Sequence, residues 1–286
     1  MDSKFAAVKA LQLIGARKID DATLFLNSLS QKGLSLGPYS QQVCSALIAS
    51  FPWDVVSKLL PRQCNFFEES GWVKSLAYNM PVDNRGTPIP WLNYSVLDFI
   101  FPRLKEKPAV FEWGSGYSTL WWGSLGGKVL SIEDSESWYD KISHDTKGTS
   151  NLEIKLCKSK DSYVNAITES WDVIQIDGSY RNECAAIAQH FLRPDGFILF
   201  DNSDSPEFSP GIKDLNNQGF FRVDFYGLIP TLPYKNCTSV FFRDFNLLVN
   251  QLPPNEQRSL PGGISCFQSI LGIRASSPQS TDNAHP

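Results

Sequence analysis

From residue 109 onward, short apolar runs alternate with stretches of helical periodicity, and this alternation constrains the fold more than any other feature of the sequence. Such alternation is typical of βαβ units, in which successive strands are parallel and helices cover the sheet. We expect strands at residues 109–113, 128–133, 152–158, 171–177 and 196–201. We expect helices at about residues 118–125, 135–146, 161–169, 182–192 and 210–218. The sequence therefore predicts a mostly parallel sheet in a three-layer αβα domain.

Two further β-rich runs, residues 221–226 and 238–243, follow the last of these helices. The segment between them contains proline and is too short to hold a crossover helix. Parallel neighbours need such a crossover, whereas antiparallel neighbours do not. We therefore expect the two runs to form an antiparallel pair.

The regions on either side of this domain have different compositions. Residues 1 to about 70 show helical periodicity interrupted by Gly and Pro, which predicts a bundle of short helices. Residues 80–94 are rich in Pro and aromatic side chains and cannot form a regular helix or a central strand, and an amphipathic helix is expected near 95–104. The end of the tail, rich in Ser and Pro, is expected to be disordered. The expected parts are an N-terminal helical extension (1–94), the αβα domain (95–245) and a C-terminal tail (246–286).

The charge balance argues against large anionic partners. The chain has 26 basic and 30 acidic side chains and a net charge of -4, which provides no long-range attraction for nucleic acid or a membrane surface. Its 6 cysteines lie far apart without a CxxC pair, and we expect reduced thiols. The N-terminus does not resemble a signal peptide, and no window reaches the roughly 18 to 20 apolar residues of a membrane-spanning helix. We expect a cytoplasmic protein of undetermined oligomeric state.

A glycine-rich turn follows the first expected strand, in the run Glu112-Trp113-Gly114-Ser115-Gly116. The two glycines allow a sharp turn and a close approach to a ligand, and Ser118 or Thr119 can cap the next helix. Thr119 stands where a nicotinamide dinucleotide fingerprint has its third glycine. Glu112 would repel a pyrophosphate and suits a ligand with a cationic amino group. A common tight turn without a ligand is the plainer alternative.

The next two expected strands also end in polar residues. Glu133 ends the second strand, where a carboxylate can accept hydrogen bonds from both hydroxyls of a ribose. The alternative is a solvated acid that favours a helix N-terminus, a role open to Asp134 and Glu136 as well. Asp161 and Ser162 follow the third strand, at a position suited to the edge of an adenine.

The fourth and fifth expected strands end in Asp177 and Asp201, at the edge where open α/β sheets bind ligands. Together with Arg181 and Asn202, these groups are expected to converge on one crevice. Such clustering is costly unless a ligand, a metal or mutual pairing satisfies the groups. An ion pair between Arg181 and Asp201 without a chemical role is the alternative.

Taken together, residues 91 to about 244 resemble a class I S-adenosylmethionine-dependent methyltransferase. The resemblance rests on Glu112-x-Gly114-x-Gly116, Glu133, Asp177-Gly178, the Leu-Arg-Pro-Asp-Gly segment at 192–196, and Asp201-Asn202. It implies a Rossmann-like sheet of seven strands whose last strand is antiparallel. It also implies S-adenosylmethionine as the cofactor and methyl transfer as the reaction, and the acidic crevice with Arg181 favours a small-molecule acceptor.

The resemblance assigns a role to each group of residues. The glycine turn with Ser115, Tyr117 and Ser118 would hold the methionine part, Glu133 with Asp134 the ribose, and Asp161 with Ser162 the adenine side. The segment before residue 95 resembles a cofactor lid, in which Trp91 or Tyr94 would face the sulfonium. Asp177 and Asp201 are the candidate general bases, with Asp177 also beside the cofactor, and Arg181 is expected to balance charge in the reaction. Tyr180, Arg181 and Asn202 are expected to contact an acceptor that is a small polar or sugar-like molecule, methylated at oxygen.

Three alternatives stay open at this point. Asp177, Asp201 and Asn202 occupy the places where metal-dependent O-methyltransferases of the catechol and caffeoyl-CoA kind hold a divalent cation. That family prefers Ala and Lys after the first acid, whereas this chain has Gly178 and then Arg181, so we do not favour a metal. The other two alternatives are an NAD(P)-dependent oxidoreductase, which would need a third glycine, and a methyltransferase-like scaffold without activity.

Overall fold

The computed structural model describes residues 3–32, 36, 39–52, 55–56, 66–249 and 259–260. Most of the expected C-terminal tail, including the part expected to be disordered, lies outside these residues. The chain divides into two compact units. The smaller unit comprises Met1–Ala77, Asp83–Arg85 and Pro261–Pro286, and the larger unit comprises Tyr78–Val82 and Gly86–Leu260. The segment expected to be a lid therefore belongs mainly to the larger unit.

The described part of the smaller unit is helical, as the periodicity predicts. Its helices are α1 (Ser3–Gly15), α2 (Ile19–Gln31), α3 (Ser40–Ser50), α5 (Phe66–Glu69) and α6 (Trp72–Tyr78). Ala10, Leu26 and Leu47 are fully buried in a cluster formed by the first three of these helices. This unit therefore has an apolar core of its own.

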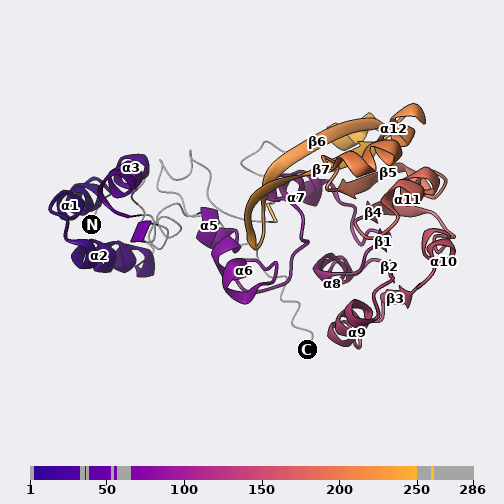
Figure 1. Ribbon diagram of the computed structural model, residues 1–286, viewed down its shortest axis with the longest axis horizontal. Helices are drawn as coiled ribbons and strands as arrows, with labels where there is room; N and C mark the ends of the chain where they lie inside the picture. The colour runs from indigo at the N-terminus through magenta and orange to yellow at the C-terminus, as the bar shows by residue number, and fades with distance from the viewer. Residues whose placement is uncertain are drawn as a thin grey trace. The chain divides into compact units, whose positions relative to one another are not determined.

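The larger unit is built on a seven-stranded sheet with the order β3-β2-β1-β4-β5-β7-β6 (Figure 1). The strands are β1 (Val110–Trp113), β2 (Val129–Glu133), β3 (Leu152–Leu156), β4 (Trp171–Ile176), β5 (Leu192–Asp201), β6 (Phe221–Ile229) and β7 (Leu232–Phe242). Neighbouring pairs from β3 to β5 are parallel, and β7 is antiparallel to both β5 and β6. The expected Rossmann-like sheet with an antiparallel last strand is confirmed.

Helices cover both faces of this sheet, and Figure 1 shows α10 to α12 on one side and α7 to α9 on the other. The first group is α10 (Lys160–Val164), α11 (Arg181–Ala188) and α12 (Ser209–Asn217). The second group is α7 (Tyr94–Ile100), α8 (Tyr117–Ser124) and α9 (Glu136–Asp145). Short 3-10 turns occupy Phe101–Arg103, Pro206–Phe208 and Phe245–Leu248.

The two faces of the sheet differ in polarity. On the α10 to α12 side, Trp113, Ile174 and Phe200 are fully buried in a continuous apolar cluster. On the opposite side, Glu112, Gln175 and Thr238 are equally buried, and each hydrogen bonds to another side chain. Burying polar groups is costly unless they are paired, and these hydrogen bonds meet that requirement.

The strands β5, β6 and β7 begin or end away from their expected positions. β5 begins at Leu192 because Leu192 pairs with Trp171, after which the register shifts so that Phe197 pairs with Val173. Pro194 lies in the intervening bulge, where it does not have to donate an N–H to a neighbour. The expected loop between β6 and β7 is instead mostly strand, because Pro230 and Thr231 form a two-residue turn closed by the pair Ile229–Leu232.

Candidate cofactor site

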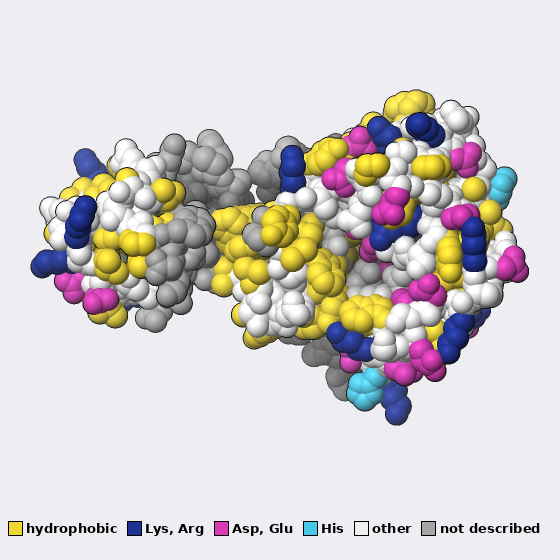
Figure 2. All heavy atoms as spheres, in the orientation of Figure 1, with side chains coloured by type: hydrophobic (Ala, Val, Ile, Leu, Met, Phe, Trp, Pro, Cys, Tyr) yellow, Lys and Arg dark blue, Asp and Glu magenta, His cyan; other side chains and the backbone are white. Residues whose placement is uncertain are grey.

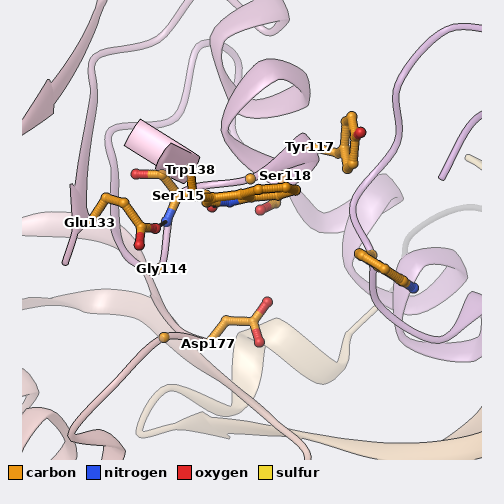
Figure 3. Close-up of a pocket in the computed structure, with 10 residues that line it drawn as sticks. Gly114, Ser115, Tyr117, Ser118, Glu133, Trp138 and Asp177 are labelled. Carbon is orange, nitrogen blue, oxygen red and sulfur yellow. Dashed lines mark hydrogen bonds between the residues drawn. The ribbon is translucent and has the colours of Figure 1, made fainter. Parts of the chain in front are cut away.

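A pocket of about 230 Å³ opens beside the carboxyl ends of β1, β2 and β4 (Figure 3). Its lining residues are Trp91, Gly114, Ser115, Gly116, Tyr117, Ser118, Glu133, Trp138, Asp177 and Gly178. All of these except Trp138 and Gly178 are residues for which the sequence predicts a role in binding the cofactor. The fold therefore brings together the glycine turn, the acid of β2 and the acid after β4, as expected.

Gly114 and Gly178 pack backbone against backbone at the base of the pocket. Gly114 has a φ of +97°, and a Cβ on it would lie 2.6 Å from the backbone nitrogen of Gly178. A Cβ on Gly178 would lie 2.1 Å from the hydroxyl of Tyr163. The Gly after Asp177, which departs from the metal-dependent family, is therefore required by this contact.

Ser115 is held through its backbone N–H, its backbone carbonyl and its hydroxyl. The N–H donates to Glu133 Oε2 at 3.0 Å, and the hydroxyl lies 2.8 Å from that of Ser131. The carbonyl oxygen accepts a hydrogen bond from the indole N–H of Trp138. The central residue of the glycine turn is thus fixed from β2 and α9 together.

Glu112 lies behind the glycine turn and does not line the pocket, contrary to the expectation that it faces a cationic amino group. Its carboxylate accepts hydrogen bonds from Ser118 at 2.5 Å, from Ser131 at 2.8 Å and from Thr119. The Thr119 hydroxyl also accepts the backbone N–H of Gly116, the N-cap of α8, at 2.8 Å, so Thr119 caps this helix as expected, whereas Ser118 bonds to Glu112. Burial raises the pKa of Glu112 to about 7, although these hydrogen bonds oppose the change.

Glu133 lines the pocket at the end of β2, where the sequence predicts a ribose ligand. Its Oε1 accepts the backbone N–H groups of Asp134 at 3.1 Å and Ser135 at 2.8 Å. Its Oε2 accepts only the N–H of Ser115, so a lone pair on that atom is available to a ligand. Burial raises the pKa of Glu133 above its ordinary value.

The residues expected at the adenine side do not line this pocket. Asp161 lies in the first turn of α10, and its carboxylate accepts a hydrogen bond from Asn165 at 2.9 Å. The hydroxyl of Ser162 lies 2.7 Å from that of Ser159. Asp134 also lies outside the lining and contributes only its backbone to Glu133. The side chains of Asp161 and Ser162 instead hydrogen bond to residues at the ends of α10.

Asp177 follows β4 and points into the pocket (Figure 3). Its Oδ1 lies 3.3 Å from a guanidinium nitrogen of Arg181, and its Oδ2 lies 3.5 Å from the amide nitrogen of Gln175. Burial and the nearby Asp201 raise the pKa of Asp177 well above its ordinary value, although Arg181 opposes this effect. The carboxyl is therefore a weaker acid, and its carboxylate a stronger base, than those of an exposed aspartate.

Arg181 does not face the pocket, and it is not paired with the Asp201 carboxylate. It donates to the backbone carbonyls of Asp177 and Asp201 at 2.6 Å each and of Gly178 at 2.9 Å. A further hydrogen bond of 3.1 Å goes to the side-chain oxygen of Asn202. The guanidinium thus ties the ends of β4 and β5 together, and the acceptor-binding role expected for Arg181 stays a prediction.

Asp201 is likewise turned away from the pocket lining and is only 4% exposed. Its Oδ1 accepts hydrogen bonds from Thr238 at 2.5 Å and Asn236 at 3.1 Å. The side-chain oxygen of Asn202 accepts a hydrogen bond from Arg181, which also contacts Asp177. Within the described ranges, no group of three or more His, Cys, Asp or Glu side chains is placed to hold a metal ion.

Of the two aromatic residues proposed for the lid, Trp91 lines the pocket and Tyr94 does not. The indole N–H of Trp91 donates to the carbonyl of Pro230, in the β6–β7 turn, at 3.0 Å. Tyr94 is buried in α7, with 3% of its surface exposed. Tyr180, expected beside the acceptor, instead packs edge-on against Tyr163 with ring centroids 5.7 Å apart.

Sequence reasoning missed Trp138 and the pocket-lining role of Gly178. Trp138 follows Glu133 within the first turn of α9, and its position after the predicted ribose-binding acid is the one signal that could have drawn attention to it.

Acidic and basic side chains are interspersed on the face of the larger unit shown in Figure 2. No helix in the described part of the chain is both long and apolar enough to span a bilayer.

No protein-family model matches the chain, and no curated protein matches it. Among solved structures, precorrin-6y C5,15-methyltransferase from Geobacter metallireducens shares 11% identity, with a TM-score of 0.42, over 51% of this chain and 87% of that one. Aeropyrum pernix fibrillarin with bound S-adenosyl-L-methionine shares 18% identity and a TM-score of 0.41, over 52% and 72%. Spermidine synthase from Thermotoga maritima shares 16% and a TM-score of 0.42, over 54% and 60%.

At these identities and TM-scores, none of the three structures determines the function of this chain. The strand order and directions stand on their own as evidence for the fold. The larger unit has a Rossmann-like αβα fold, with a pocket at the glycine turn after its first strand.

Proposed function

We propose that this chain is an S-adenosylmethionine-dependent methyltransferase acting on a small polar or sugar-like acceptor at an oxygen atom. One observation carries the proposal: the pocket at the glycine turn is bounded by the carboxyls of Glu133 and Asp177 and by the ring of Trp91. Among the described residues that line it, none is Lys, Arg or His. Such a lining suits a ligand with a sulfonium and an ammonium group.

The same lining disfavours the oxidoreductase alternative. A nicotinamide dinucleotide would place its pyrophosphate at the N-terminus of α8, close to Glu133 and Asp177. Bringing these anionic groups together without a paired cation is costly in a buried site. Arg181 is already ion-paired with Asp177 and donates to three backbone carbonyls, and it does not line the pocket, so it is not available to a pyrophosphate.

Within this proposal, the chain acts mainly by positioning. The turn at Gly114 to Gly116 holds the amino-acid part of the cofactor, the free lone pair of Glu133 accepts a ribose hydroxyl, and Trp91 faces the sulfonium. When bound, the cofactor supplies the electrophilic methyl group. Asp177 accepts the proton of the acceptor hydroxyl, and its raised pKa suits that role at neutral pH.

We also place the proposed reaction in the cytoplasm. Cys157, Cys184 and Cys237 are free thiols, which suits a reducing compartment. A small-molecule acceptor suits a chain with a net charge of -4, which has no long-range attraction for nucleic acid. No metal ion is needed in this scheme, because Asp177 can accept the proton without one.

Thermal unfolding with separate additions of S-adenosylmethionine, S-adenosylhomocysteine, NAD and NADP tests the cofactor. We expect the first two to stabilise the protein, by about 2.7 kcal/mol at 100 times the dissociation constant, and the dinucleotides to have no effect. A matched pair of variants locates the site: Glu133→Gln, in the pocket wall, should reduce this stabilisation, whereas Asp161→Asn, outside the pocket, should keep it. Stabilisation by NAD alone would contradict the proposal.

Turnover distinguishes an enzyme from a scaffold that only binds the cofactor. Formation of S-adenosylhomocysteine with a mixture of polar metabolites, measured at pH 6 to 9, should rise with pH as Asp177 loses its proton. Asp177→Asn should bind the cofactor but lower the rate about 100-fold or more, as expected for loss of a general base. Tight binding with no turnover on any acceptor would favour the scaffold.

A further inference from the structure

β6 is an edge strand of the sheet. Among the described strands it pairs only with β7, and it lies along the outer edge in Figure 1. An unpaired edge presents a row of backbone N–H and C=O groups to any chain that can pair with it. β6 is 9 residues long, and residues 221–226 contain neither proline nor glycine. This edge can therefore accept another strand unless its side chains prevent pairing.

Two charged side chains of opposite sign, Arg222 and Asp224, project from the same face of β6, because they are two residues apart. Arg222 Nε lies 3.0 Å from Asp224 Oδ1, and both side chains are about one third exposed. Ser239 of β7 donates to the same carboxylate oxygen at 2.6 Å and holds it in place. The two charges lie symmetrically on either side of Val223, and residues 221–226 have no net charge.

This symmetry makes the edge complementary to itself in one register. Residues directly opposite each other in an antiparallel pair lie on the same face of the sheet. A two-fold axis through Val223 places Arg222 of each copy opposite Asp224 of the other. An axis through Arg222 or Asp224 would place like charges opposite each other, which is destabilising. The charges therefore favour pairing of β6 with a second β6 about Val223.

The apolar side chains of β6 fit the same register. Phe221 is 45% exposed and would lie opposite Phe225 of the second copy, and Val223 would lie opposite its own counterpart. Phe221 stacks on Phe245 with ring centroids 4.2 Å apart, and Phe225 stacks on Phe99 at 4.7 Å. Both rings are thus already held in place. Cross-strand aromatic pairs stabilise antiparallel strands, and pairing would remove exposed apolar surface from water.

The opposite edge strand, β3, carries a similar charge pair but lacks the other features. Glu153 and Lys155 lie 3.4 Å apart, with side chains 62% and 48% exposed. β3 is only 5 residues long and has no aromatic side chain. The large apolar side chains exposed in the described part of the chain include Phe221 and Tyr226 on β6 and none on β3. Of the two edges, β6 is the better interface.

We propose that β6 is the interface of a two-fold symmetric homodimer, in which two copies of β6 pair antiparallel about Val223. The sheet of one copy continues into the sheet of the other, and backbone hydrogen bonds between the strands supply the attraction. The alternating charges and the aromatic pairs set the register. Because the candidate cofactor pocket lies at β1, β2 and β4, the inference does not depend on the proposed function.

Charge reversal tests the interface. Arg222→Asp makes both charged positions negative and Asp224→Arg makes both positive, so each variant should raise the dimer dissociation constant at least about tenfold. An equimolar mixture of the two variants should form heterodimers, because opposite charges then face each other. The double variant with both substitutions should recover the homodimer for the same reason. Lys155→Glu, on β3, is the matched control and should dimerise like the wild type.

Sedimentation velocity over a series of protein concentrations measures the dimer in each protein, and circular dichroism checks that each variant is folded. A wild type that remains monomeric throughout the series overturns the inference. So does a dimer that survives both charge reversals, or a mixture of the two folded variants that remains monomeric, because the copies would then associate through another surface or not at all.

Val223→Cys tests the register without changing any charge. The two introduced cysteines would lie opposite each other at the two-fold axis, within reach of a disulfide, so mild oxidation should give a covalent dimer. Phe221→Cys places its cysteine opposite Phe225 and should not cross-link beyond the wild type, whose 6 native cysteines set the background. Should the charge variants fail to fold, this comparison decides, and equal cross-linking in the two cysteine variants rejects the register.

Discussion

At the scale of single residues, the two glycines of the turn have different roles, although the sequence suggests the same one for both. Gly114 has a left-handed φ and no room for a side chain. Gly116 has a φ of -173°, which any residue can adopt, and a Cβ on it would come no closer than 3.8 Å to Ser118. Gly114 is thus needed to form the turn, whereas Gly116 leaves space in front of it for a ligand.

Alanine substitutions at Gly178 and Gly116 separate folding from binding. Gly178→Ala should lower the free energy of unfolding by roughly 2–4 kcal/mol, because its methyl group would overlap Tyr163 and Gly114. Gly116→Ala should change stability by less than about 1 kcal/mol but weaken S-adenosylmethionine binding. Urea denaturation and calorimetry measure the two effects. A stable Gly178→Ala protein would show that the strand ends can move apart.

The buried carboxyl of Glu112 should make stability depend on pH. Its pKa is about 7 in the folded chain and about 4.5 when unfolded, so the folded state retains a proton that the unfolded state releases between these values. The free energy of unfolding therefore falls as pH rises through this window, by at most about 3 kcal/mol from this group. Glu112→Gln should flatten the profile in urea denaturation at pH 5, 6 and 7.5. Parallel profiles for the two proteins would contradict the assignment.

At the scale of helices and strands, the sequence predicted the order and type of the elements because apolar periodicity is a local property. It also placed Glu133 and Asp177 correctly, since the end of a parallel strand fixes which edge of the sheet a residue occupies. It could not predict the partners of Arg181 and Asp201, because the choice between a backbone carbonyl and a carboxylate depends on side-chain geometry. Trp138 was missed for the same reason, since its partner Ser115 lies on another element.

The segment before α7 is joined to the β6–β7 hairpin by side chains rather than by strand pairing. Asn93 is fully buried, donates to the carbonyl of Phe225 at 2.9 Å and to Thr238 at 3.1 Å, and accepts the N–H of Val96 as the cap of α7. Ser95 is exposed and donates to the carbonyl of Tyr226 at 3.2 Å.

Replacing these two residues by alanine should have unequal effects. Asn93→Ala should destabilise the chain by about 2–4 kcal/mol, because it removes a helix cap and leaves buried groups without partners. Ser95→Ala should cost less than about 1 kcal/mol, because water can replace its hydrogen bond. Chemical denaturation checks both values. Equal losses would mean that the segment is held by packing rather than by Asn93.

At the scale of the whole molecule, the two units have separate apolar cores, and the candidate site lies entirely in the larger one. Units with separate cores commonly unfold in separate transitions. Calorimetry of the full chain should therefore show two transitions, of which saturating S-adenosylmethionine raises only the one that belongs to the larger unit. A single transition that shifts as a whole with the ligand would show that the units unfold together.

The hydrogen bond from Trp91 to Pro230 determines how late in synthesis the pocket can be completed. It joins positions 139 residues apart, and the acceptor lies in the turn between the last two strands. A nascent chain that has emerged only as far as β5 would already contain Glu133 and Asp177. It would lack the Pro230 carbonyl that holds the Trp91 indole in the pocket wall. Long-range contacts of this kind form late in folding. Cofactor capture should therefore wait until synthesis has passed the final hairpin.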